Sequence, residues 1–368
     1  MTLSVTPPPA PSDKGPLAAR TRYGVTRSQL GELLADQPRY RADQVWDGLY
    51  AQLSLLEDLT TLPRSLRDEL GDRLPAALAL VTEQRGDGGT TRKALWRLAD
   101  GVLVESVLML YPERATVCIS TQAGCAMGCG FCATGQAGFT RHLAVGEIVE
   151  QVVEAAREAR GAGRRLSNVV FMGMGEPLAN LDRVWASVER LHGDLGLSAR
   201  HLTISTVGLV PGIDRLAAAS LPVNLAVSLH AANDTRRDEL VPVNRRYPLD
   251  VLMAACGRYL EAKGRRLSFE WALIDGINDR ASDARVLAEL AHTLPLPAHV
   301  NLLPLNPTPG WPTKGTAPAG VQLFRQLLVA RGVNATVRQN RGTDIDAACG
   351  QLAAGQPVEL TAPGTRRI

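Results

Sequence analysis

Three cysteines stand close together in the segment Cys125-Ala-Met-Gly-Cys129-Gly-Phe-Cys132, separated by three residues and then by two. Thiolates at such short spacing can bind three of the four irons of a cubane iron–sulfur cluster. The fourth iron then has no protein ligand, so it can bind and activate a small molecule. The spacing therefore indicates an open cluster that takes part in chemistry.

Zinc and disulfide bonds are the alternatives for these thiols. A structural zinc site needs four ligands, usually from two C-x2-C pairs or with two histidines. No second cysteine pair follows here, and His142 is the only histidine nearby. Three clustered cysteines cannot all pair with one another, and nothing marks the chain as secreted. The iron–sulfur interpretation is favoured.

Composition sets broad limits on the protein. A chain of 368 residues with 45% hydrophobic residues can bury one large core and a smaller one. The net charge of +3 does not by itself indicate a nucleic-acid partner. Arginine pairs such as Arg236-Arg237 could meet phosphates, but each pair is expected on a solvated face.

The two ends of the chain are expected to lie outside the folded part. Residues 1–24 are rich in proline and lack the apolar core of a signal peptide, so they are predicted to form a disordered leader. Residues 356–368 are expected to form a tail. No apolar run reaches the ~18 residues of a membrane helix. The protein is therefore expected in the cytoplasm, with reduced thiols and no membrane partner.

Residues 25–85 are predicted to form a small helical domain. Thr26 can cap a helix whose leucines recur at helical spacing until Pro38, and a second apolar set follows from Val45 to Tyr50. Gly86-Asp87-Gly88-Gly89 is predicted to be a turn or flexible joint.

Strands and helices alternate over residues 90–355. Strands are expected at 91–98, 102–110, 115–120, 168–172, 202–205, 223–229, 267–273, 300–303 and 335–338, and helices at 143–159, 181–191, 249–263 and 283–292. This alternation predicts an α/β fold with a parallel sheet. Since there are fewer than eight units, a partial (β/α) barrel is expected. Its site should lie at the carboxyl ends of the strands, where Gly173–Pro177, Ser205, Ser228–His230 and Asn306 occur.

Two of these features together resemble the radical S-adenosylmethionine (SAM) superfamily: the three cysteines, and Gly173-Met-Gly-Glu-Pro177 after a strand. Further segments narrow the resemblance to the RlmN/Cfr family of RNA methyltransferases. They are Cys118-Ile-Ser-Thr-Gln-Ala-Gly-Cys125, Ser228-Leu-His-Ala231, Asn301-Leu-Leu-Pro-Leu-Asn306 and Arg341-Gly-Thr-Asp-Ile-Asp-Ala-Ala-Cys349-Gly350. The similarity runs from about Thr26 to Leu352.

The resemblance implies methylation of an adenine ring carbon in RNA. In the RlmN branch this carbon is C2, both in the peptidyl-transferase centre of 23S rRNA and in the tRNA adenosine next to the anticodon. The Cfr branch methylates C8 of the same rRNA adenosine. The resemblance further implies a 4Fe–4S cluster on Cys125, Cys129 and Cys132, two SAM molecules per turnover, and an electron donor such as flavodoxin or ferredoxin.

Adenine C2 is not a nucleophile, so a carbon radical must add to the ring. By the resemblance, Cys349 first takes a methyl group from SAM. A radical made from a second SAM removes a hydrogen from this methyl group, and the resulting carbon adds to adenine as an RNA–protein crosslink. Glu105 would accept the ring proton. Cys118 would then attack the sulfur of Cys349, which leaves a transient disulfide and frees the product.

The resemblance also suggests which residues contact SAM. Gly175 and Glu176 would meet its amino group, and Ser205 its polar tail or ribose. Ser228, Leu229, His230 and Asn306 would contact its ribose and adenine. A plain strand-to-helix turn is the alternative for Gly173–Pro177.

The helical domain is the candidate for docking RNA, with Arg39, Arg41 and Arg64 as possible phosphate contacts. A plain cap on the barrel is the alternative for this domain. Two other functions stay open: an activase that makes a radical on a partner protein, and a non-catalytic metal-binding RNA module. Cys256 matches no motif and is predicted to serve packing alone.

Overall fold

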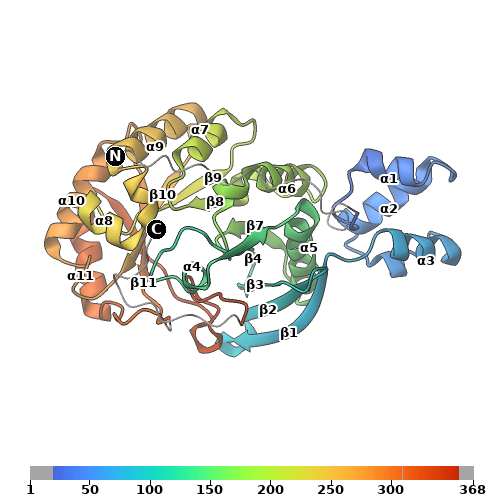
Figure 1. Cartoon of the computed structure of the whole chain (residues 1–368), viewed down its shortest axis with the longest axis horizontal. Coiled ribbons are helices and arrows are strands. Elements are labelled where there is room, and N and C mark those ends of the chain that lie inside the picture. Colours follow the sequence, from blue (N-terminus) through green and yellow to red (C-terminus); the bar gives the residue numbers. More distant parts are fainter. Residues whose placement is uncertain (1–19, 309, 356–368) are drawn as a thin grey trace, which may run out of the picture.

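The computed structural model describes residues 20–308 and 310–355, and it divides into a small helical lobe and a large α/β part (Figure 1). The expected tail and most of the expected leader lie outside the described residues. Residues 20–24, also expected in the leader, are packed, and Tyr23 is fully buried. In the described ranges, no helix has the length and apolar character needed to cross a membrane.

The lobe contains α1 (Arg27–Leu33), α2 (Tyr40–Tyr50), the 3-10 helix η1 (Leu56–Asp58) and α3 (Arg64–Arg73). The predicted cap is present, because Thr26 and Gln29 bond each other's backbone amide at the start of α1. Helices were expected up to residue 85, but Leu78–Gly86 forms strand β1. The reason is tertiary, because this segment pairs along its whole length with β2.

One ten-stranded sheet organises the larger part. Its strands, in spatial order, are β1, β2 (Thr91–Leu98), β3 (Leu103–Leu110), β4 (Ala115–Cys118), β7 (Leu166–Phe171), β8 (Leu202–Thr206), β9 (Asn224–Ser228), β10 (Leu267–Leu273), β11 (His299–Pro304) and β12 (Asn334–Val337). The ladders from β1 to β4 are antiparallel, and those from β4 to β12 are parallel. Within the described ranges no ladder joins β12 to β1. The predicted partial barrel is thus confirmed.

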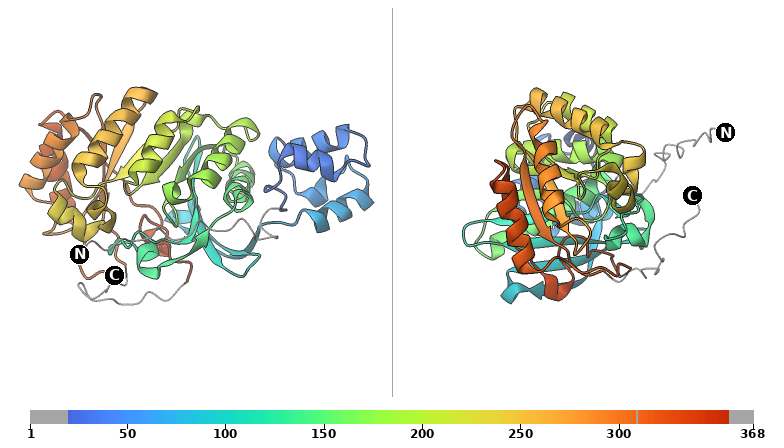
Figure 2. Two further views of the ribbon diagram at one scale, coloured as in Figure 1. Left: turned by 45° about the horizontal axis from the view of Figure 1, so that its top comes forward. Right: turned by 90° about the vertical axis from the view of Figure 1, so that its left-hand side faces the viewer.

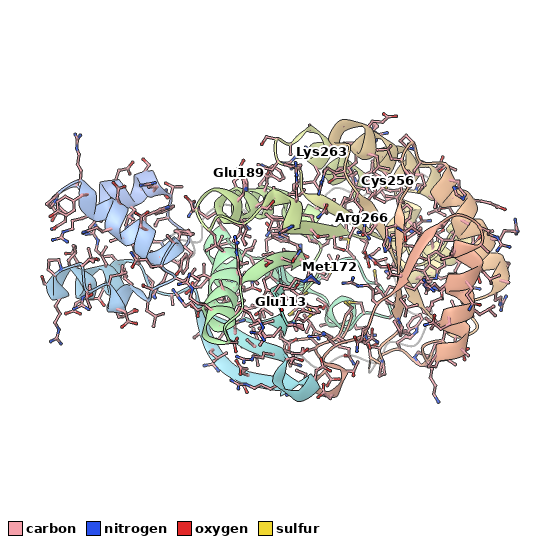
Figure 3. All side chains as sticks on the ribbon, turned by 180° about the vertical axis from the view of Figure 1, so that it is seen from behind. Glu113, Met172, Glu189, Cys256, Lys263 and Arg266 are labelled. Carbon is pink, nitrogen blue, oxygen red and sulfur yellow. The ribbon has the colours of Figure 1, made fainter. Side chains whose placement is uncertain are left out.

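Helices cover the outer face of this curved sheet (Figures 1 and 2). They are α5 (Val145–Gly161), α6 (Leu181–Gly193), α7 (Val210–Ala218), α9 (Leu249–Lys263), α10 (Ala281–His292) and α11 (Pro318–Val329), whereas α8 (Asp234–Leu240) lies at the carboxyl ends of β8 and β9. The core lies between the two layers, where Trp271 of β10 stacks on Phe324 of α11. Cys256 of α9 is buried in this core, as predicted (Figure 3).

Short elements complete the chain. They are α4 (Ala133–Ala137), the hairpin strands β5 (Gln122–Gly124) and β6 (Phe139–His142), and the 3-10 helices η2 (Asp87–Gly89), η3 (Pro177–Asn180), η4 (Ala199–His201), η5 (Pro242–Arg245) and η6 (Thr343–Ile345). The sequence analysis did not predict α4, α7, α8 or the β5–β6 hairpin. Most of these segments are too short for helical or strand periodicity to be recognised.

Three arginines of the barrel bind the lobe, and one of them, Arg160 of α5, donates to the carbonyls of Gln52 and Ala51. Arg157 of α5 donates hydrogen bonds to the hydroxyl of Tyr23 at 2.7 Å and to the carbonyl of Ser54 at 2.9 Å. Arg190 of α6 donates to the hydroxyl of Tyr50 at 2.9 Å. Each guanidinium thus holds several groups of the lobe, so the lobe has a defined position on the outside of α5 and α6.

Candidate active site

The residues proposed from the sequence gather at the carboxyl ends of the parallel strands. Cys118 is the last residue of β4, Ser205 lies near the end of β8, and Ser228 is the last residue of β9. Gly175 and Glu176 follow β7, and Asn306 follows β11. Parallel strands place these ends on one edge of the sheet, so residues far apart in sequence share one site.

The three clustered cysteines occupy a loop between β5 and β6 that includes α4. The Cys125 amide donates to the carbonyl of Gly138 at 2.7 Å, and the Cys132 amide donates to the carbonyl of Cys129 at 3.1 Å. Gly135 has no room for a side chain, because a Cβ there would lie 2.9 Å from the Cys129 carbonyl oxygen. The loop is therefore a compact backbone turn that keeps the three cysteines close to one another.

The thiols of this loop interact. Cys129 is buried, whereas Cys125 and Cys132 are half-buried. Burial raises the pKa of Cys125 to about 12 and raises that of Cys129 still further, and the neighbouring thiols add to both shifts. Binding a metal would release these protons. Among the described residues, no three His, Cys, Asp or Glu side chains converge as a single-metal site requires. Three clustered thiols are the ligand set of an iron–sulfur cluster with one open iron.

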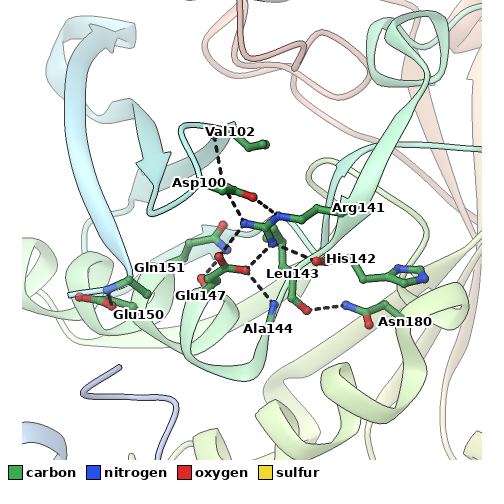
Figure 4. A network of polar contacts seen from close by, with 11 residues as sticks. Asp100, Val102, Arg141, His142, Leu143, Ala144, Glu147, Glu150, Gln151 and Asn180 are labelled. Atoms are coloured by element: carbon green, nitrogen blue, oxygen red, sulfur yellow. Dashed lines mark hydrogen bonds and ion pairs between the residues drawn. The ribbon is translucent and has the colours of Figure 1, made fainter. Parts of the chain in front are cut away.

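A polar network braces the hairpin that carries the cysteine loop (Figure 4). Arg141 of β6 bonds Asp100 at 2.6 Å and Glu147 of α5 at 2.8 Å. Asn180 donates to the carbonyls of Thr121 and Leu143, which lie on either side of the hairpin, at 3.0 and 2.9 Å. The hairpin is consequently tied to α5 and to the turn after β7.

The turn after β7 needs both of its glycines. Gly175 has φ +104°, and a Cβ there would lie 2.5 Å from the Cβ of Gln122. A Cβ at Gly173 would lie 2.7 Å from the carbonyl of Ile119. Only glycine allows so close an approach to the chain that follows β4. The turn therefore packs directly against the segment leading into the cysteine loop.

Glu176 is buried, and both of its carboxylate oxygens bond the protein itself. Oε1 accepts from the amide of Leu178 at 2.9 Å, and Oε2 accepts from the amide of Val207, after β8, at 2.8 Å. Burial raises the pKa of Glu176 to about 7. Glu176 thus joins the turns after β7 and β8, and any ligand contact of its carboxylate would be added to these bonds.

His230 and Leu229 are enclosed more than the other candidates. His230 Nδ1 accepts a hydrogen bond from the amide of Ala272 at 3.0 Å, and its ring packs edge to face on Phe131 of the cysteine loop. Burial, together with Arg237, lowers the pKa of His230 to about 3, so the ring is neutral. The side chain of Leu229 is fully buried. The structure therefore presents Ser228, which is only half-buried, at this strand end.

Cys118 and Cys349 come together although they lie far apart in the chain. Burial raises the pKa of Cys118, and the proximity of Cys349 raises it further. Cys349 is exposed, and its carbonyl accepts a hydrogen bond from Asn306 at 3.1 Å. The next residue, Gly350, bonds the amide of Ala133 in α4 at 2.7 Å. The segment that carries Cys349 is therefore anchored beside the cysteine loop.

Glu105 of β3 is buried and contacts this same C-terminal segment. Its Oε2 accepts from the amides of Ala353 and Ala354 at 2.9 and 3.0 Å. Its Oε1 lies 3.4 Å from the ammonium nitrogen of Lys93, which also donates to the carbonyl of Asp346 at 3.3 Å. The carboxylate is thus held against the residues that follow Cys349 in the sequence.

The sequence analysis missed two cations at the site, the half-buried Lys93 and the fully buried Arg237. Arg237 was expected on a solvated face, yet it is fully buried, and that expectation is wrong. Leu240 and Val241 follow it at helical spacing, so they indicated which face of α8 points inward. No sequence pattern marked Lys93, because its partner Glu105 lies on the neighbouring strand β3 and the two meet only in the folded sheet.

Comparison with known proteins shows which family this chain resembles. A family model described as the radical SAM superfamily matches residues 119–287. The probable dual-specificity RNA methyltransferase RlmN of Chloroflexus aurantiacus is 51% identical over 355 residues, covering 93% of this chain and 94% of the relative. The protein of the same description from Parafrankia sp. is 54% identical, covering 88% and 89%.

One solved structure has the same fold over nearly the whole chain. It is a crystal structure of a radical SAM methyltransferase from Sphaerobacter thermophilus, with a TM-score of 0.88 and 51% sequence identity. The match covers 91% of this chain and 99% of that one. The helical lobe and the partial barrel therefore occur together in a relative.

Proposed function

Because the chain belongs to the RlmN family of radical SAM RNA methyltransferases, we propose that it methylates C2 of adenine in 23S rRNA and in tRNA. The rRNA target would be the peptidyl-transferase centre, and the tRNA target the adenosine next to the anticodon. The observation that best supports this proposal is the meeting of Cys118 and Cys349 beside the cysteine loop.

Membership of the family implies a 4Fe–4S cluster and SAM. Cys125, Cys129 and Cys132 would hold the cluster, and SAM would lie at the ends of β7, β8, β9 and β11. When bound, the cluster would supply the electron that splits SAM into methionine and a carbon radical. This electron would come from a donor such as flavodoxin or ferredoxin, and two SAM molecules would be used per turnover.

Cys349 would be the first residue to act. Its thiolate displaces S-adenosylhomocysteine from one SAM, so the methyl–sulfonium bond breaks and a methyl–sulfur bond forms at Cys349. The residue is exposed, but burial of its thiol and the neighbouring Glu270 raise the pKa of Cys349, so the thiol must lose a proton before it attacks. The bonds from Asn306 to Cys349 and from Ala133 to Gly350 hold its backbone next to the region where SAM would bind.

Glu105 would accept the proton that leaves the adenine ring once the Cys349 carbon is attached, and the unpaired electron of this adduct would return to the oxidised cluster. A base must lie within hydrogen-bonding reach of that proton. The bonds from Ala353 and Ala354 to the Glu105 carboxylate support this role, because they keep it beside the segment that would carry the crosslinked adenine. Replacing Glu105 with glutamine should therefore make the crosslink accumulate.

Cys118 would release the product. Its thiolate attacks the sulfur of Cys349, a disulfide forms, and the bond from that sulfur to the transferred carbon breaks, so that this carbon keeps the electron pair and takes up a proton to become the methyl group. An external dithiol must then reduce the disulfide before the next turnover. The reaction therefore belongs in a reducing compartment, and we place the protein in the cytoplasm.

The helical lobe is the proposed docking element for RNA. Arg39 and Arg64 are exposed on it and are free to approach phosphates at its surface, although Arg64 lies 3.9 Å from Asp68. Arg41 is already engaged, because it donates to the carbonyl of Thr61 at 2.7 Å. The target adenine would have to leave its stack to reach the strand ends.

A trapped intermediate tests the proposal. The Cys118→Ala variant would be purified without oxygen, loaded with iron and sulfide, and incubated with SAM, a reductant and an rRNA fragment. We expect mass spectrometry to find the RNA attached to Cys349, whereas the Cys256→Ala variant should release methylated RNA.

Other outcomes would favour other functions. Cleavage of SAM without methylation of Cys349 or any crosslink would contradict the proposal and favour an activase that acts on another acceptor. Formation of 8-methyladenine would assign the chain the Cfr-like reaction. The absence of any SAM consumption by the loaded protein would favour a non-catalytic RNA-binding role.

A further inference from the structure

Arg237 of α8 is a fully buried charged side chain that no step above uses. Among the described residues it is second only to Trp271 in size within the fully buried set. Transferring a guanidinium from water into a protein interior costs several kcal/mol unless other groups compensate its charge. A negatively charged group that compensates this buried charge is therefore expected nearby.

The direct partners of Arg237 are all uncharged. Nε donates to the carbonyl of Leu229 at 3.1 Å, Nη1 to the side chain of Asn244 at 2.8 Å, and Nη2 to the carbonyls of Val207 and Ser228 at 2.7 and 3.3 Å. Across the part of the chain that the structure describes, it forms no ion pair. These bonds satisfy its donors, but they leave the positive charge unbalanced.

Carboxylates reach Arg237 only through Asn244. The amide of Asn244 donates to Asp234 at 2.9 Å and to Asp238 at 2.7 Å, and its oxygen accepts from Arg237. Both carboxylates belong to α8 and are more exposed than Arg237. They therefore weaken the field of the guanidinium without neutralising it.

Two thiols also lie near Arg237, those of Cys129 and Cys256, and the Cys129 thiolate has the larger influence on it. Cys129 packs in one apolar cluster with Leu240 and Val241, which stand one helical turn after Arg237. Burial lowers the pKa of Arg237 to about 10, and a thiolate at Cys129 opposes this shift more than any carboxylate does. The guanidinium thus lies near one of the three expected cluster ligands, and both residues are buried.

We propose that Arg237 is a positioning residue that supplies the buried positive charge balancing the thiolate-ligated cluster, and that it makes the cluster easier to reduce. One-electron reduction adds a negative charge to the cluster. A fixed cation in a low-dielectric interior lowers the energy of the reduced state more than that of the oxidised state. The electron that reduces the cluster would come from the donor named above, such as flavodoxin or ferredoxin. The inference rests on the cluster and not on which adenine carbon is methylated.

A purely structural role is the rival explanation, because Arg237 also joins the ends of β8 and β9 through Val207 and Ser228. The two explanations differ in the cluster's midpoint potential. Loss of a structural tie would lower iron content or thermal stability and leave the potential of the remaining clusters unchanged.

The test is an anaerobic redox titration of the full-length, cluster-loaded chain, followed by electron paramagnetic resonance. Arg237→Gln should shift the midpoint potential to more negative values, and Arg237→Lys, which keeps the charge, should shift it less. Asp238→Asn should shift it in the opposite direction, because it removes a carboxylate and keeps an oxygen that can accept from Asn244. Arg258→Gln is the matched control, since Arg258 is exposed and pairs with Asp214.

Unchanged potentials in Arg237→Gln and Asp238→Asn would overturn the inference, even if the iron content fell. If Arg237→Gln does not fold, Asp238→Asn decides alone, and an unshifted potential there has the same meaning. A wild-type chain that takes up no cluster would overturn both this inference and the proposed function. A loaded wild type without RNA methylation would overturn only the proposed function.

Discussion

The side-chain amide of Asn306 donates a hydrogen bond to the backbone carbonyl of Cys349 over 3.1 Å. It joins the end of β11 to the C-terminal segment that carries the exposed thiol. Asn340 in turn donates to the side-chain oxygen of Asn306 at 2.7 Å, which fixes the orientation of its amide. A contact to its backbone therefore holds Cys349 in position, and this contact does not involve its sulfur.

Asn306→Ala should slow methylation of Cys349 by about 10- to 100-fold, because a small displacement of a nucleophile is costly to the rate. The rate can be followed by the intact mass of the loaded protein with SAM. SAM affinity should be measured beside it, since Asn306 is also a proposed SAM contact. Asn224→Ala is the control, because Asn224 lies at the amino end of β9, away from the site, and donates to the carbonyl of Arg200. An unaltered methylation rate in Asn306→Ala would contradict this role.

Gly175→Ala should disrupt the turn after β7. The added Cβ would lie 2.5 Å from Gln122, and the alanine backbone would have to keep φ +104°. A destabilisation of about 2–4 kcal/mol and weaker SAM binding are therefore expected. Urea denaturation and SAM titration measure the two effects. Gly193→Ala is the control, because a Cβ added at this last residue of α6 would meet no neighbouring element within 4 Å. Equal stability of the two variants would refute the steric argument.

Arg157→Met should loosen the helical lobe. The substitution removes the hydrogen bonds to Tyr23, Ser54 and Leu53, so the lobe should become more sensitive to limited proteolysis by at least several-fold. RNA affinity should fall, while cleavage of SAM without RNA should persist in the barrel. Arg285→Met loses only an exposed pair with Glu289 and serves as the control. Wild-type proteolysis in Arg157→Met would show that the lobe is held by other contacts.

Glu150 predicts a pH dependence of stability. It is buried in α5, where it accepts the amide of Ala77 at 2.6 Å, and burial raises its pKa from 4.5 to about 7. Between these values the folded protein keeps a proton that the unfolded chain has lost. Stability present below pH 4.5 is therefore lost as the pH rises through 7, by about 3 kcal/mol.

Glu150→Gln should remove this dependence, because glutamine has no proton to lose and can still accept from Ala77. Denaturation midpoints of variant and wild type should nearly coincide at about pH 5, and the variant should be more stable at about pH 8. Glu189→Gln on the surface of α6 is the control. A variant less stable than wild type at the higher pH would mean that the ionised carboxylate stabilises the fold through Arg22 and Arg157.

The sequence by itself determined the alternation of strands and helices and the location of the site. Nine expected strands and four expected helices are present within a few residues of their predicted ends. These features are local, because periodicity reports which face of an element is buried. The spacing of Cys125, Cys129 and Cys132 is also local, so it indicated a cluster before any fold was known.

Only the tertiary structure decided which distant groups meet. It brought Cys118 to Cys349, bound Glu105 to the C-terminal segment, and buried Arg237 where a solvated face was expected. It also paired Leu78–Gly86 with β2 as a strand. The physical reason is the same in each case. Burial, pairing and charge balance depend on neighbours supplied by remote parts of the chain, and local sequence pattern carries no record of them.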